Sequence, residues 1–243
     1  MKVHFVKSIV LLLTISLFSC NNTKEKSVSH TSDTDVQVIG AMKDVMWKGE
    51  LQGKISLDTI KNKIGLYGIG PESYLTGEIL IMEGKSYVSM VETDSTMMVK
   101  ETYNTAAPFF VYANVIEWET IKVPTKVKDM LALEQYIDSI TKEAKRPFAF
   151  KVSGKVSEAV IHIQNLPKGA SVSSPEEAHQ GQIDYNLINE AIDIVGFFST
   201  EHKAIFTHHD SFMHLHLISK DKSKMGHLDS AVFEDLTLYL PRN

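Results

Sequence analysis

The chain has 243 residues, of which 43% are hydrophobic and 23% charged, and its formal net charge at pH 7 is −5. This length and balance are sufficient for one large globular domain or two small ones. The acidic balance argues against a nucleic-acid-binding protein, for which a basic surface is typical, so no nucleic-acid partner is expected.

The first 19 residues have the pattern of an export signal. Two lysines precede an apolar run, Ile9 to Phe18, that is too short to span a bilayer as a mature helix. The run ends in Leu-Phe-Ser-Cys at residues 17–20, which resembles the lipobox of bacterial lipoproteins. That resemblance implies a signal peptide over 1–19, a lipid on Cys20 and a membrane-anchored protein of the bacterial cell envelope. The alternative is a plain secretory signal in which Cys20, the only cysteine, is incidental.

Residues 20–40 are rich in Ser, Thr, Asp and Lys and show no apolar periodicity, so we expect a disordered tether there. The folded domain is expected at 41–243, with an N-terminal half at 41–145 and a C-terminal half at 146–243.

Strands dominate the N-terminal half. A Glu-Gly-Lys turn at 83–85 indicates a hairpin, and apolar residues at helical spacing predict one amphipathic helix. The expected elements are, in chain order, a helix at 41–47, a short helix beginning near Ser56, strands at 77–82, 86–91, 97–102 and 109–118, and the amphipathic helix at 127–142.

Strands also dominate the C-terminal half. The expected elements are strands at 148–152 and 159–163 joined near Gly154, a helix or loop at 175–180, and strands at 192–198, 212–218 and 232–240. Strand-rich blocks with a few segregated helices are typical of an α+β fold. We therefore expect two β-rich halves with mixed sheets and a few helices.

Three histidines near the C-terminus have the spacing of a metal site. In a strand, residues two apart point to the same side, so His214 and His216 should face one pocket. A polar turn follows, and His227 can return on a neighbouring strand. Three imidazoles without a fourth strong ligand are typical of a catalytic zinc that keeps one position open. The alternative is a pair of half-buried histidines on a sheet.

A second histidine pair, His208 and His209, precedes this strand. Adjacent residues in a strand face opposite sides, so we interpret this pair as part of a polar loop. His202 and His179 are interpreted as surface residues.

Several segments together resemble the α-acetolactate decarboxylase family, over about residues 41–240. The segments are Gly-Ile-Gly at 68–70 with Leu-Thr-Gly-Glu-Ile at 75–79, Ala-Pro-Phe at 107–109, Phe-Ala-Phe-Lys-Val-Ser-Gly at 148–154, Ile-Val-Gly-Phe at 194–197, and His-Leu-His-Leu-Ile at 214–218 with Gly-His at 226–227.

This resemblance implies a metal site between the two halves, with His214, His216 and His227 as zinc ligands. It also implies that Glu78 handles protons beside the metal, where the residues alone favour an exposed strand glutamate. The family places a substrate-contacting arginine where this chain has His162, and a small hydroxyl residue where it has Pro71. A family glutamate near the C-terminus has no counterpart after His227.

The resemblance implies an enzyme that decarboxylates 2-acetolactate to acetoin and CO2 with Zn²⁺ as its cofactor. Its partner would be a small 2-hydroxy-3-keto acid, and a homodimer is expected on family grounds. Two alternatives remain open: a zinc-containing lipoprotein that binds such an acid without turnover, and a zinc hydrolase with Glu78 as its base.

Overall fold

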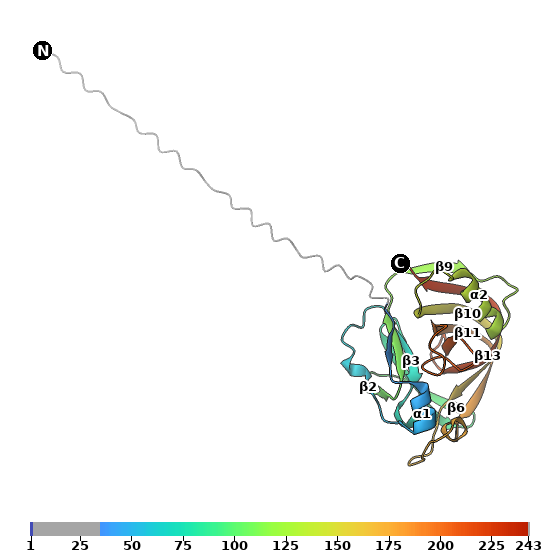
Figure 1. Cartoon of the computed structure of the whole chain (residues 1–243). Coiled ribbons are helices and arrows are strands. Elements are labelled where there is room, and N and C mark those ends of the chain that lie inside the picture. The colour runs from blue at the N-terminus through green and yellow to red at the C-terminus, as the bar shows by residue number, and fades with distance from the viewer. Residues whose placement is uncertain (2–34, 243) are drawn as a thin grey trace. The chain divides into compact units, whose positions relative to one another are not determined.

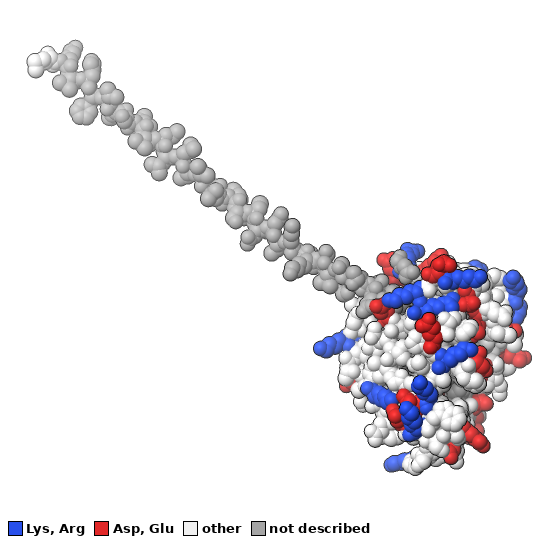
Figure 2. Space-filling view, in the orientation of Figure 1, with Lys and Arg blue, Asp and Glu red and all other residues white. Residues whose placement is uncertain are grey.

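The computed structural model describes Met1 and residues 35–242. The predicted signal peptide, Cys20 and most of the predicted tether therefore lie outside the described residues. Within the described part of the chain, no helix is long and apolar enough to cross a membrane. On the face of the folded part seen in Figure 2, acidic and basic side chains are interspersed.

The first sheet is antiparallel and six-stranded (Figure 1). Its strands, in spatial order, are β1 (Gln37–Ile39), β8 (Phe110–Asn114), β3 (Leu66–Pro71), β4 (Glu78–Met82), β5 (Lys85–Thr93) and β6 (Thr96–Glu101). Short turns join β3, β4, β5 and β6, which is why neighbouring strands run in opposite directions.

The second sheet is also antiparallel and holds the longest strands. In spatial order they are β10 (Phe148–Ile163), β11 (Ile183–Phe198), β12 (Met213–Ser219), β13 (Met225–Pro241) and β9 (Trp118–Lys122). Because β10 pairs with both β11 and β13, four of these strands close into a ring of hydrogen-bonded neighbours. This closure brings β12, β13 and β10 side by side.

The remaining elements are short. They are β2 (Ile55–Ser56) paired with β7 (Ala106–Ala107), the helices α1 (Met42–Lys48), α2 (Met130–Ile140) and α3 (Pro175–Ala178), and 3₁₀ turns at Leu57–Thr59 and Ser73–Leu75. Helix α2 begins where the Asp129 side chain accepts the Ala132 N–H at 2.8 Å. It buries Leu133 and Ile137 against the second sheet.

A shared hydrophobic core joins the two sheets. It contains residues of β3, β4 and β8 from the first sheet and residues of β10, β11, β12 and β13 from the second. On β12, Leu215 and Leu217 belong to a separate core on the other side of the strand, whereas Ile218 packs in the shared core. Since side chains alternate along a strand, His214 and His216 point with Ile218 toward the first sheet.

The predicted α+β fold with two β-rich halves is confirmed, but several details differ. Every pairing between the named strands is antiparallel, so the sheets are not mixed. Strand β1 lies within the predicted tether. The predicted strand at 109–118 is instead β8 and β9, which belong to different sheets. The chain leaves the first sheet after Asn114 and joins β13 from Trp118.

Gly154 marks a close strand approach rather than a turn. Residues 148–163 form one continuous strand, with pairing irregularities just after Gly154. A Cβ at Gly154 would lie 2.0 Å from the backbone oxygen of Asp235 on the neighbouring strand. Glycine is therefore required here because β13 passes too closely for any side chain.

Candidate metal centre and cavity

The three predicted histidines converge at one buried point. His214 and His216 are neighbours on the same side of β12, and His227 is the direct register partner of His216 on β13. All three side chains are buried, and one nitrogen from each lies within 4.8 Å of those of the other two. The sheet pairing therefore supplies the third imidazole, which the spacing alone only suggested.

Two of the three imidazoles have ring nitrogens without a hydrogen-bond partner. His214 Nδ1 and both nitrogens of His216 are buried without a hydrogen-bond partner. Burial lowers the pKa of His216 to about 3, and it lowers the pKa values of His214 and His227 well below the usual range. Near pH 7 the three rings are thus neutral, which is the form that binds metal. Unsatisfied buried nitrogens cost stability unless something occupies them, so this donor set fits a metal ion.

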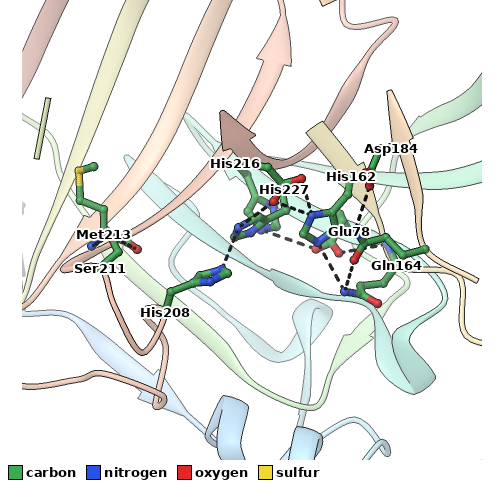
Figure 3. Close-up of polar contacts among 11 residues, drawn as sticks. Glu78, His162, Gln164, Asp184, His208, Ser211, Met213, His216 and His227 are labelled. Carbon is green, nitrogen blue, oxygen red and sulfur yellow. Dashed lines mark hydrogen bonds and ion pairs between the residues drawn. The ribbon is translucent and has the colours of Figure 1, made fainter. Parts of the chain in front are cut away.

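Glu78 approaches the triad from the opposite sheet. It begins β4, is 2% exposed, and its Oε2 lies 3.6 Å from His216 Nε2 (Figure 3). Its Oε1 accepts the Gln164 backbone N–H at 3.3 Å. Burial, with the nearby carboxylates of Asp229 and Glu72 acting in the same direction, raises the pKa of Glu78 well above its usual value. The structure therefore places Glu78 beside the triad, not on the exposed strand surface that the residues alone favoured.

His162 extends the histidine row by one strand. It is the register partner of His227 on β10, so His216, His227 and His162 lie in line across β12, β13 and β10. Its ring stacks on that of His227, with 4.7 Å between centroids. Both carboxylate oxygens of Asp229 lie 2.8 Å from His162 Nδ1. The carboxylate fixes the ring's orientation and leaves Nε2 for the cavity side, where Gln164 is 3.5 Å away.

Sequence reasoning missed Asp229, His208 and Gln164, all of which contact the predicted site residues. Asp229 is two residues after His227 on β13, so the same alternation that pairs His214 with His216 predicts that it shares their side. His208 was interpreted as part of a polar loop. It does lie in the loop before β12, but its ring turns inward, and its Nε2 is 3.1 Å from His227 Nε2 (Figure 3). No periodic pattern marks a loop residue in this way.

Gly226 lets β13 pass close to β10 at the site. A Cβ at this position would lie 2.5 Å from the backbone oxygen of His162. A larger residue would force the strands apart between His162 and His227. The glycine before the third histidine therefore has a packing role that sets the spacing of the row.

The site opens into a cavity of about 390 Å³. Its lining includes His214, His227, His162 and Glu78, together with His208 and Pro71. The cavity runs from the space between the two sheets toward α1 and α3. Its size is in the range of small-molecule binding sites.

Comparisons with known proteins show which family the chain belongs to. The family model described as Alpha-acetolactate decarboxylase matches residues 39–242. The chain belongs to this family. It is 27% identical over 183 residues to an alpha-acetolactate decarboxylase of Lactococcus lactis subsp. cremoris, covering 72% of this chain and 71% of that protein. It is 23% identical over 191 residues to one from Brevibacillus brevis, covering 78% and 64%.

Solved structures support the fold assignment. The alpha-acetolactate decarboxylase of Bacillus subtilis strain 168 has a TM-score of 0.70 at 23% identity, with 86% of each chain covered. A Staphylococcus aureus protein described as similar to alpha-acetolactate decarboxylase has a TM-score of 0.70 at 17% identity, with 84% of each chain covered. At these identities the likeness concerns the fold.

Within this decarboxylase family fold, the structure brings together all five described residues that the sequence singled out for chemistry. His214, His216 and His227 form the triad, Glu78 faces it from the other sheet, and His162 lies beside it. The site lies between the two sheets, as expected. Cys20, the predicted lipidation site, lies outside the described residues.

Proposed function

We propose that this chain is a zinc-dependent decarboxylase of 2-acetolactate or a closely related 2-hydroxy-3-keto acid. The observation that carries the proposal is the triad of neutral, buried imidazoles, two of them with unsatisfied ring nitrogens, together with the buried Glu78 carboxyl group next to a cavity. Nitrogen ligands and a three-residue donor set that leaves a position free favour zinc among the common metals.

The reaction needs charge stabilisation and one proton. In 2-acetolactate the carbinol carbon carries the carboxylate and is attached to the ketone carbon. When its bond to the carboxylate breaks, CO2 leaves and the electron pair moves toward the ketone oxygen, forming an enediolate. One proton delivered to the carbinol carbon then gives acetoin. Zinc, when bound, would supply a Lewis acid for the oxygen on which negative charge develops.

Glu78 is the group best placed to hold that proton. The Gln164 N–H fixes one of its oxygens, and the other points toward the space in front of His216. A substrate held against the triad would lie within reach of this second oxygen. The carboxyl therefore has the position of a general acid with a fixed orientation.

His162 takes the place in which the family resemblance puts an arginine. It lacks the two-pronged geometry of a guanidinium group, but Asp229 orients it and its Nε2 side lines the cavity. We assign it the role of a hydrogen-bonding partner for a polar substituent of the substrate. This role needs orientation more than charge.

The direct test is an assay of acetoin and CO2 from racemic 2-acetolactate, using the zinc-loaded full chain and a chelator-treated sample. We expect turnover that disappears with the metal and returns when zinc is restored. If zinc is bound stoichiometrically and no acetoin forms, the decarboxylase proposal fails. Thermal stabilisation by unconsumed acetolactate would then favour a binding lipoprotein, and cleavage of ester substrates would favour a hydrolase.

A further prediction concerns Asp229. Replacing it with asparagine keeps the side-chain shape but removes the charged partner of His162 Nδ1. We expect kcat/KM for acetolactate to fall about tenfold to a hundredfold, as is typical when an orienting partner is lost, with zinc content unchanged. Asp235→Asn, an exposed substitution on the same strand, is the matched control. Equal rates for the two variants would contradict an orienting role for Asp229.

A further inference from the structure

Much of the cavity lining is apolar and is not used by the chemistry proposed above. His214, His227, Glu78 and His162 supply only part of the lining. Apolar side chains from α1, from the stretch after β3, from the residue before β8 and from the start of α3 also line it: Met42, Met46, Trp47, Leu75, Phe109 and Pro175. We call these six residues the apolar arm.

The volume of the cavity exceeds what acetolactate fills. A dry protein cavity of about 150 Å³ accommodates benzene, whereas this cavity measures about 390 Å³. The only apolar groups of acetolactate are two methyl groups. With its polar groups at the triad, most of the apolar arm would stay in contact with water.

The wall of the apolar arm is held firmly in place. The backbone N–H groups of Met42 and Lys43 donate to Ile205 and Ala204 at 2.7 and 2.9 Å, which fixes α1 to the loop before β12. Val45 of α1 packs in a buried cluster with Leu75 and Phe109 of the same arm. The arm is therefore a preformed surface, which is the usual state of a ligand site.

Trp47 lines the cavity and is 59% exposed. A rigid aromatic side chain left in water beside an open cavity offers a large contact area to an apolar ligand group. It lies on the same helix as Met42 and Met46, which also line the cavity.

We propose that the apolar arm binds an alkyl or aromatic group larger than methyl on the carbinol carbon of the substrate. The preferred substrates are then bulkier homologues of 2-acetolactate. The reaction named here rests on the proposed function, whereas the binding of the apolar group rests on the cavity alone.

The activity test compares 2-acetolactate with homologues that carry isobutyl or benzyl in place of the carbinol methyl, using the zinc-loaded full chain. We expect kcat/KM to be higher by about tenfold or more for the isobutyl compound, since added methylene groups in an apolar pocket discriminate by such factors. Trp47→Ala should reduce this ratio severalfold. Trp118→Phe, which changes a ring packed on Tyr67 outside the cavity, should preserve it.

A binding test separates this inference from the proposed reaction. The chain has two tryptophans, so Trp118→Phe leaves Trp47 as the only source of indole fluorescence. We expect 2-hydroxy-2,4-dimethylpentanoate, which has no ketone to react, to perturb Trp47 fluorescence with a Kd about tenfold lower than that of 2-hydroxy-2-methylpropanoate.

The results of the activity and binding tests distinguish the proposed function from the proposal for the apolar arm. If no keto acid is decarboxylated but the larger hydroxy acid binds more tightly, the proposed function fails and the apolar arm stands. If acetolactate is the best substrate and the two hydroxy acids bind alike, the apolar arm is overturned and the proposed function stands. Equal loss of all substrates in Trp47→Ala would also overturn it, because a size-selective surface must change the ratio.

Discussion

His216→Ala is expected to remove stoichiometric metal binding and, with it, acetolactate turnover. The side chain is fully buried, and neither of its nitrogens has a hydrogen-bond partner. It is also the residue that links the other two, being a neighbour of His214 on β12 and the register partner of His227 on β13. Loss of one of so few ligands should weaken zinc binding by about a hundredfold or more. Equilibrium dialysis with metal analysis measures this directly.

Thermal unfolding provides a second readout of the same prediction. Zinc at about a thousand times its Kd should stabilise the wild-type protein by about 4 kcal/mol, which for a domain of this size raises Tm by roughly 10 °C. In His216→Ala this rise should be absent. Because the comparison is made with and without metal for each protein, it remains valid if the variant is itself less stable.

Two companion variants sharpen the interpretation. His216→Gln fills most of the space that alanine leaves, so its loss of the zinc-dependent rise in Tm would separate ligation from packing. His202→Gln changes a histidine whose Nδ1 bonds to Ser199 Oγ at 2.7 Å and which does not line the cavity, and it should keep the full rise. Metal binding at wild-type affinity by both His216 variants would contradict the triad.

The sequence predicted the structure best where the regular repeat of a strand or helix determines which side chains share a side. The spacing of His214 and His216 defines a shared side because strand side chains alternate, and the structure confirms that side. The same rule would have found Asp229 from His227. The amphipathic helix near residues 127–142 was also predictable, and it is observed over 130–140, because its apolar spacing follows the helical repeat.

Other features depend on contacts that no local pattern contains. Trp118 was predicted as the end of the strand at 109–118, but in the structure it begins β9, which pairs with β13 in the second sheet. Gly154 suggested a turn because glycine is common in turns, but it is needed where two strands nearly touch. Glu78 looks like an exposed strand residue in isolation. Only the packing of one sheet on the other buries it, which is why the family resemblance, not the residue pattern, assigned it to the site.

Glu78→Gln is expected to lower kcat for acetolactate by roughly a hundredfold to ten-thousandfold while zinc remains bound. A positioned acid or base typically contributes a rate factor of this size. Glutamine preserves the side-chain length, and its amide oxygen can still accept the Gln164 N–H. The amide cannot deliver a proton to carbon. Steady-state kinetics with parallel zinc analysis measures the effect, and Glu101→Gln, a change on the exposed outer strand β6, is the control.

Although Glu78→Gln should lower kcat, it should raise the stability of the metal-free protein at pH 7. Burial raises the pKa of Glu78 well above its usual value of 4.5, so between these two values the folded chain holds a proton that the unfolded chain releases. Folding stability from this group is therefore lost as pH rises above about 4.5. Glutamine does not titrate, so metal-free Glu78→Gln should be more stable than wild type at pH 7, with the difference vanishing near pH 4. If the variant is less stable than wild type at both pH values, Glu78 has a packing role. If the variant turns over substrate more slowly but is more stable at pH 7, the carboxyl group contributes to catalysis through its proton and not to stability.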